Sequence, residues 1–208
     1  MSKSRVETLS DGIFAIAITL LVLTIPQPGN YNELGSELAK RWPSVAAYVV
    51  SFGVIGIMWL NHHSVFGRFE RVDRGLFYLN LFLLLTIVFI PYPTGVLGEA
   101  LRRGQGARVA AVAYSATMAV NGYAWAAIWL YGTRRRRLLE PSFPDSALGP
   151  ATARFTIGSV LYTISVGVGF INAYACLAFH ALLAVYYALD PLSRRGPSAP
   201  DADPFQSS

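Results

Sequence analysis

The stretch Arg5–Ile25, which reads RVETLSDGIFAIAITLLVLTI, decides the fold. Its strictly apolar part, Gly12–Ile25, is 14 residues long, or about 21 Å of helix, whereas the hydrocarbon core of a bilayer is about 30 Å thick. A helix that spans the bilayer must therefore begin near Arg5, and it then carries the carboxylate of Asp11 inside the membrane. An ionisable side chain at that depth predicts a functional site, and it needs a partner.

The composition agrees with a membrane protein. The 208 residues are 53% hydrophobic and only 14% charged, whereas a soluble domain carries about 25% charged residues. We therefore expect an all-α protein that crosses the membrane several times. The single cysteine, Cys176, excludes an intrachain disulfide. The chain contains no serine-nucleophile, phosphate-loop, haem or zinc signature, so we expect neither an enzyme nor a bound cofactor.

Four further runs without Asp, Glu, Lys or Arg predict the remaining spans. They are Trp42–Gly67, Gly75–Gly98, Val109–Thr133 and Phe155–Leu189. The last run is too long for one crossing, so we expect a tight hairpin around Phe170–Asn172 and two short spans, which makes six transmembrane helices. A re-entrant final segment, leaving five spans, is the alternative. Pro91 and Pro93 are expected to bend or end the third span, and 33–41 to form a short outer helix.

The distribution of charge favours six spans. The inner loops then hold 12 of the 17 Lys and Arg residues and the outer loops hold five. Because positive residues favour the cytoplasmic side, we expect the protein in the plasma membrane with both termini in the cytoplasm. The run Arg134–Arg137 is expected to face anionic lipid headgroups rather than nucleic acid. Residues 1–190 form the membrane domain, and the Pro-, Ser- and Asp-rich tail 191–208 is expected to be disordered.

One face of the first span carries regularly spaced aliphatic residues. Gly12, Ile16, Leu20 and Leu23 share this face, and Thr19 flanks it. One interpretation is a helix packed in a protein core. The other is that several copies line a pore, with Ile16, Leu20 and Leu23 forming stacked hydrophobic rings that gate by excluding water.

The partner expected for Asp11 lies on the second span. Arg5 points to another side of its own helix, whereas the sequence Trp59-Leu60-Asn61-His62-His63 reaches the depth of Asp11. A contact from His62 or His63 would satisfy the carboxylate, either as structural support or as a proton-sensitive site. Adjacent histidines on a helix point about 100° apart and no cysteine is near, so a metal site is not expected.

The pattern Arg5-x4-Ser10-Asp11-Gly12, followed by Ile16–Leu23 and then by Trp59-x-x-His62, resembles the transmembrane protein 175 family. This family comprises the endolysosomal potassium channel and its bacterial relatives. The segment Ile90-Pro91-Tyr92-Pro93 is similar to the third span of the family. The family triplet is usually Phe-Ser-Asp, whereas this chain has Leu9-Ser10-Asp11.

The resemblance implies a homotetramer whose four first helices line the pore. Ile16 would form the narrowest ring, with Thr19, Leu20 and Leu23 beyond it. A support network would hold the pore helix; it comprises Arg5, Ser10, Asp11, Trp59, His62 and, as the alternative contact, His63. The permeant ion would be K⁺, and the chain lacks the Thr-Val-Gly-Tyr-Gly filter of other potassium channels.

Three functions compete. The first is a passive cation channel with a modest preference for potassium, which has membrane lipids and three further copies of the chain as partners. The second is a proton-coupled transporter that uses Asp11 and His62, against which the lack of an internal repeat argues. The third is a membrane scaffold or enzyme subunit, against which the regular aliphatic face of the first span argues.

Overall fold

The computed structural model describes residues 2–189, apart from the side chain of Arg135. The predicted tail 191–208 lies outside the described residues. The helices are α1 Lys3–Leu20, η1 Leu21–Thr24, η2 Tyr31–Glu33, α2 Leu34–Ala39, α3 Trp42–Gly67, α4 Arg74–Phe89, α5 Pro91–Arg103, α6 Ala107–Thr133, η3 Arg134–Arg136, α7 Asp145–Ile171 and α8 Ala173–Leu189. The prediction of an all-helical protein is confirmed.

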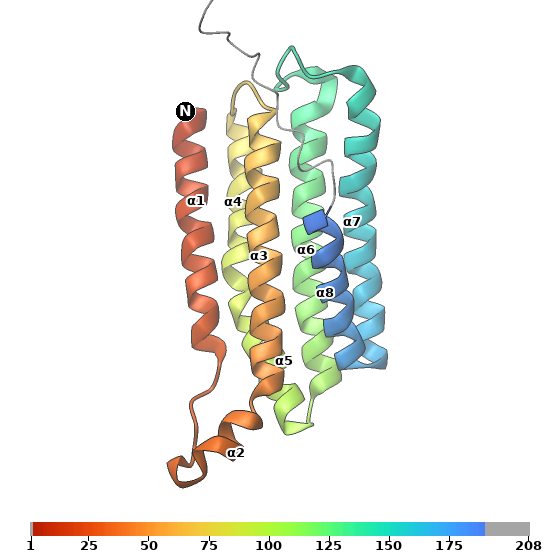
Figure 1. The fold of residues 1–208 in the computed structure, drawn as a ribbon. Coiled ribbons are helices and arrows are strands. Elements are labelled where there is room, and N and C mark those ends of the chain that lie inside the picture. The colour runs from red at the N-terminus through yellow and green to blue at the C-terminus, as the bar shows by residue number, and fades with distance from the viewer. Residues whose placement is uncertain (1, 190–208) are drawn as a thin grey trace, which may run out of the picture.

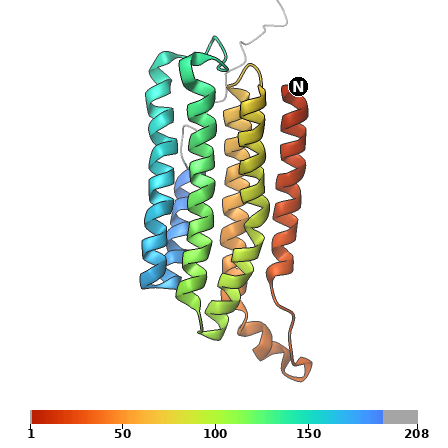
Figure 2. The same cartoon turned by 180° about the vertical axis from the view of Figure 1, so that it is seen from behind.

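The long helices stand side by side in one bundle (Figure 1). The first helix, α1, lies at one edge of the bundle beside α3 and α4, and α7 lies at the opposite edge. Figure 2, the view from behind, shows the same order. The short helix α2 lies at the end of the bundle away from the N-terminus, and it corresponds to the short helix predicted for residues 33–41.

Four helical segments are long and apolar enough to cross a membrane. They are Lys3–Thr24, Trp42–Gly67, Arg74–Arg103 and Asp145–Ile171, and α8 is a shorter apolar helix. The segment Arg74–Arg103 contains α4 and α5, which join at Ile90 without leaving helical backbone angles. Pro91 and Pro93 therefore mark a local interruption in this segment rather than its end.

The predicted break in the last apolar run is present, and α8, which follows it, is short as predicted, but the prediction of a short span before the break is wrong. The backbone at Asn172 is extended, and the Asn172 side chain accepts hydrogen bonds from the Tyr174 and Ala175 amides at the start of α8. However, α7 has 27 residues because it begins at Asp145. The search for runs without charged residues missed the first turns of α7, because Arg154 lies inside the helix. The Arg154 guanidinium contacts the Tyr187 ring there.

Candidate pore helix and its hydrogen-bond network

The first helix has one buried face and one uncovered face. The buried side chains follow helical spacing toward α3 and α4: Val6, Ser10, Phe14, Ala17 and, in η1, Leu21. On the other side, Ile16 is 55% exposed, Leu20 39% and Leu23 76%. Thr19 is also exposed, and its hydroxyl donates to the Ile16 carbonyl at 2.9 Å. The face predicted from the sequence is therefore bare in the single chain.

A chain of buried polar side chains ties α1 to the helices behind it. The Ser10 hydroxyl donates to the Val6 carbonyl at 2.8 Å, and the Asn80 amide donates to the Ser10 oxygen at 3.0 Å. The Asn80 carbonyl oxygen lies 2.9 Å from the Nε2 atom of His62. One side chain each from α1, α4 and α3 thus meets in the core.

The direction of each hydrogen bond in this chain follows from the donors available. A hydroxyl has one proton, and the proton of Ser10 goes to the Val6 carbonyl, so Ser10 can only accept from Asn80. The NH₂ group of Asn80 must therefore face Ser10, and its carbonyl oxygen faces His62. Consequently, Nε2 of His62 carries a proton and donates it to Asn80.

Asp11 has a different partner from the one predicted. Its carboxylate accepts a hydrogen bond of 2.8 Å from the indole N–H of Trp59. The expected contact from His62 or His63 is wrong: the His62 ring stacks on Phe66 with centroids 4.2 Å apart, which directs it to Asn80 instead. His63 is exposed on the surface of α3.

Of the predicted support residues, the structure brings together Ser10 with His62, through Asn80, and Asp11 with Trp59. Arg5 is exposed and lies outside both groups among the described residues. Asn80 was missed by sequence reasoning. The available signal was a lone amide within the apolar run Gly75–Gly98, because such a group needs a hydrogen-bond partner in a bilayer.

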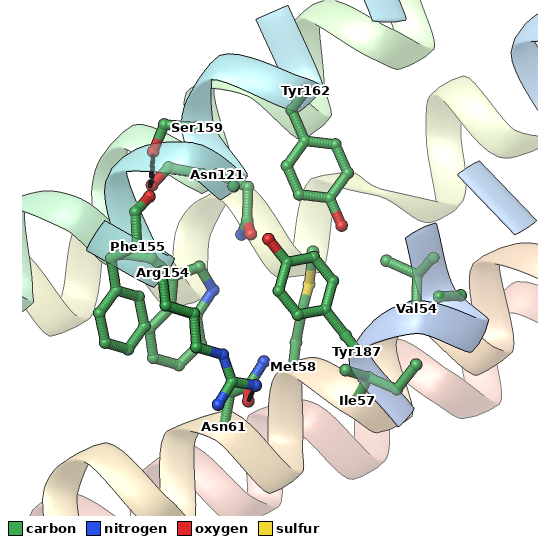
Figure 3. Close-up of a pocket in the computed structure, with 14 residues that line it drawn as sticks. Val54, Ile57, Met58, Asn61, Asn121, Arg154, Phe155, Ser159, Tyr162 and Tyr187 are labelled. Atoms are coloured by element: carbon green, nitrogen blue, oxygen red, sulfur yellow. Dashed lines mark hydrogen bonds between the residues drawn. The ribbon is translucent and has the colours of Figure 1, made fainter. Parts of the chain in front are cut away.

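A separate cavity of about 50 Å³ lies between α3, α6, α7 and α8. Figure 3 shows Asn121, Tyr162 and Tyr187 directing polar atoms into the same region. The Asn121 NH₂ group donates to Thr86 at 2.7 Å, whereas its carbonyl oxygen is buried without a donor among the described residues. A cavity of this size has room for water. It is remote from the bare face of α1.

Among residues 2–189, no group of three or more His, Cys, Asp or Glu is placed to hold a metal ion.

The bundle, its apolar helices and the bare aliphatic face of α1 define a helical membrane protein of the multi-span class. The chain belongs to the TMEM175 family: the family model for the endosomal/lysosomal potassium channel TMEM175 matches residues 5–91. A potassium channel of Streptomyces collinus is 46% identical over 202 residues, covering 95% of this chain and 98% of that protein.

Two further comparisons agree. The crystal structure of a lysosomal potassium-selective channel TMEM175 homolog from Chamaesiphon minutus matches with a TM-score of 0.81 and 34% identity, covering 90% of this chain and 96% of that one. The human endosomal/lysosomal proton channel TMEM175 is 36% identical over 101 residues, which is 44% of this chain and 20% of that protein. The resemblance read from the sequence is confirmed.

Proposed function

We propose that this chain is a potassium channel with modest selectivity, in which the first helices of four identical chains surround one pore. The observation that carries the proposal is the bare face of α1. Ile16, Leu20 and Leu23 are exposed on a helix that packs through its other side at the edge of the bundle. Relatives of similar length are named potassium channels. Copies of such a face can enclose an axis that one chain cannot.

The proposed topology has six spans in one membrane domain over residues 1–190. They are α1 with η1, α3, α4 with α5, α6, α7 and α8. With 27 residues, α6 is about 40 Å long and can cross a bilayer, and α8, with 17, reaches about 25 Å. An even number of spans puts both ends of the chain on one side, which the distribution of Lys and Arg assigns to the cytoplasmic face of the plasma membrane.

Ile16 forms the narrowest ring of the proposed pore, with Thr19, Leu20 and Leu23 beyond it. The permeant ion is K⁺, and the rings act by the cost of wetting a narrow apolar passage. Ser10, through Asn80 and His62, holds α1 from its buried side.

The remaining members of the support network are exposed at the surface of the single chain. Asp11 and Trp59 join α1 to α3 there through their hydrogen bond. Arg5 and His63, both exposed within one chain, act where neighbouring chains meet.

The proton-coupled transporter is supported less well. It needs a proton to pass between Asp11 and His62, but Asp11 is hydrogen-bonded to Trp59 and His62 to Asn80. The two groups therefore belong to separate hydrogen-bond systems.

Potassium flux into liposomes tests the gate. Ile16→Asn should give the highest flux and the weakest preference for potassium over sodium, because an amide wets the constriction. Ile16→Ala should lie between this variant and the wild type, since it widens the ring but leaves it apolar. Thr19→Val should lower the flux, because it removes a hydroxyl that can replace water around the ion. Equal flux in the Ile16 variants and the wild type would place the pore elsewhere.

Disulfide cross-linking tests the assembly. Ile16→Cys should cross-link between chains, whereas Val185→Cys, on the exposed side of α8, should not. The native Cys176 is buried and contributes little background. A protein that stays monomeric in mild detergents, without cross-links at position 16, would contradict the tetramer.

A further inference from the structure

Arg41 is a buried arginine at the end of the bundle away from the N-terminus. It lies between α2 and α3, directly before Trp42, and it is only 5% exposed. An arginine is almost never buried to this extent without partners. Its guanidinium group must therefore be satisfied by the protein around it.

The partners of Arg41 come from two segments. Its Nε atom donates to the Pro26 carbonyl at 3.0 Å and Nη2 donates to the Gln27 carbonyl at 2.8 Å. Nη1 donates to the backbone carbonyl of Glu37 and, at 3.0 Å, to the Glu37 carboxylate. A planar guanidinium can reach all of these acceptors at once, whereas a lysine ammonium is a single point on a flexible stem.

The contact with Arg41 lowers the pKa of the Glu37 side chain. The hydrogen bond from Arg41 holds the pKa of Glu37 below its ordinary value of 4.5. Lys40 also contacts the carboxylate at 3.4 Å, but from an exposed position. The Glu37 carboxylate is therefore ionised near neutral pH and anchors the guanidinium to α2.

The two loop carbonyls directly follow the far end of the first helix. Pro26 is three residues beyond Leu23, the most exposed of the aliphatic residues on the bare face. Within the chain, η1 is held by buried Leu21 and by Thr24, which packs against Gly95 of α5. The side chain of Leu23 has little packing of its own, so its position depends on the backbone on either side.

We propose that Arg41 is a positioning residue for the pore: by gripping the Pro26 and Gln27 carbonyls, it fixes the distance of Leu23 from the axis. The inference rests on the proposed function, in which α1 surrounds that axis. Arg41 touches no ion. It acts through the loop backbone, and it joins the loop after the pore helix to the last turn of α2 and the start of α3.

The experiment compares disulfide formation at two depths in the full-length protein. Leu23→Cys and Ile16→Cys are each combined with Arg41→Gln, Arg41→Lys or the control Lys40→Gln, and oxidation is followed in membranes with copper phenanthroline. The control removes a neighbouring cation that contacts the same Glu37 carboxylate, while the grip on the loop carbonyls stays intact.

Both Arg41 variants should change the rate of cross-linking at position 23 by about tenfold, the factor that corresponds to one lost charge-assisted hydrogen bond. The rate at position 16, nearly two helical turns away, should stay at the wild-type value. Lys40→Gln should change neither rate. Arg41→Lys keeps the charge beside Glu37, so it remains informative if Arg41→Gln assembles poorly.

The outcomes distinguish the central position of α1 from the positioning role of Arg41. If neither cysteine cross-links in an otherwise wild-type chain, the central position of α1 fails. If both cross-link but the Arg41 variants leave the rate at position 23 unchanged, α1 is central and the role of Arg41 is wrong. Equal changes of the cross-linking rate at positions 16 and 23 would show that Arg41 gives general structural support, which overturns the positioning role. A lower yield of tetramers, with wild-type cross-linking rates in the tetramers that form, would overturn it as well.

Discussion

Replacing Asn80 by alanine should destabilise the protein more than any loss of a single exposed polar group. The change removes two buried hydrogen bonds, to Ser10 at 3.0 Å and to His62 at 2.9 Å. Such bonds contribute about 0.6 kcal/mol each in membrane proteins, and leaving the His62 N–H without an acceptor adds about 1–3 kcal/mol. The expected loss is about 2–4 kcal/mol, or roughly a 30- to 700-fold shift in the unfolding equilibrium.

The assay is reversible unfolding in mixed micelles, followed by tryptophan fluorescence at fixed protein concentration. Thr117→Ala is the control, because its exposed hydroxyl bonds only to its own helix. A double-mutant cycle of Ser10→Ala with Asn80→Ala should give a coupling energy of about 0.6–1 kcal/mol. Additivity within about 0.3 kcal/mol, or a loss for Asn80→Ala no larger than for the control, would refute the energetic role of the network.

Two further predictions concern packing and pH. Gly98→Ala should lower the free energy of unfolding by about 1–3 kcal/mol in the same assay, because its new Cβ would lie 2.8 Å from the Ser44 Cα. Gly53→Ala is the control and should change it little, because its Cβ would meet no atom within 4 Å. Because the pKa of Glu37 is lowered by Arg41, its ionised form stabilises the loop above pH 4.5 and loses this effect as the pH falls toward the lowered pKa. Proteolysis within 26–41 should then increase at acid pH in the wild type but not in Glu37→Gln.

The sequence predicted the helices better than their contacts. Apolar runs mark α1, α3 and α6 closely because a bilayer accepts few other segments. The shared face of Ile16, Leu20 and Leu23 on α1 was also predicted, since helical spacing alone assigns side chains to faces, but the spacing left open whether that face is buried or exposed. The start of α7 was missed, because a charged residue can lie inside a helix when another helix covers it, as Tyr187 covers Arg154.

Partners across helices could not be read from the sequence. Asp11 was identified from its depth, but the choice between Trp59 and His62 depends on ring packing that only the folded core sets. Asn80 carries no charge and was therefore passed over in a search based on charge. Arg41 was one of the five Lys and Arg residues assigned to the outer loops, because the inward direction of its side chain depends on the path of residues 26–40.

The winding of the last turn of the first helix changes the alignment of its aliphatic residues. An α-helix advances about 100° per residue, so residues three apart differ by about 60° in direction. In a 3₁₀ turn, with three residues per turn, they eclipse. Because η1 follows Leu20 directly, Leu23 lies almost above Leu20, and Ile16 is about 40° from that line. The 3₁₀ turn therefore narrows the angular spread of the three side chains from about 60° to about 40°, and relaxing it to α-helix would swing Leu23 about 60° away from Leu20 without moving Ile16.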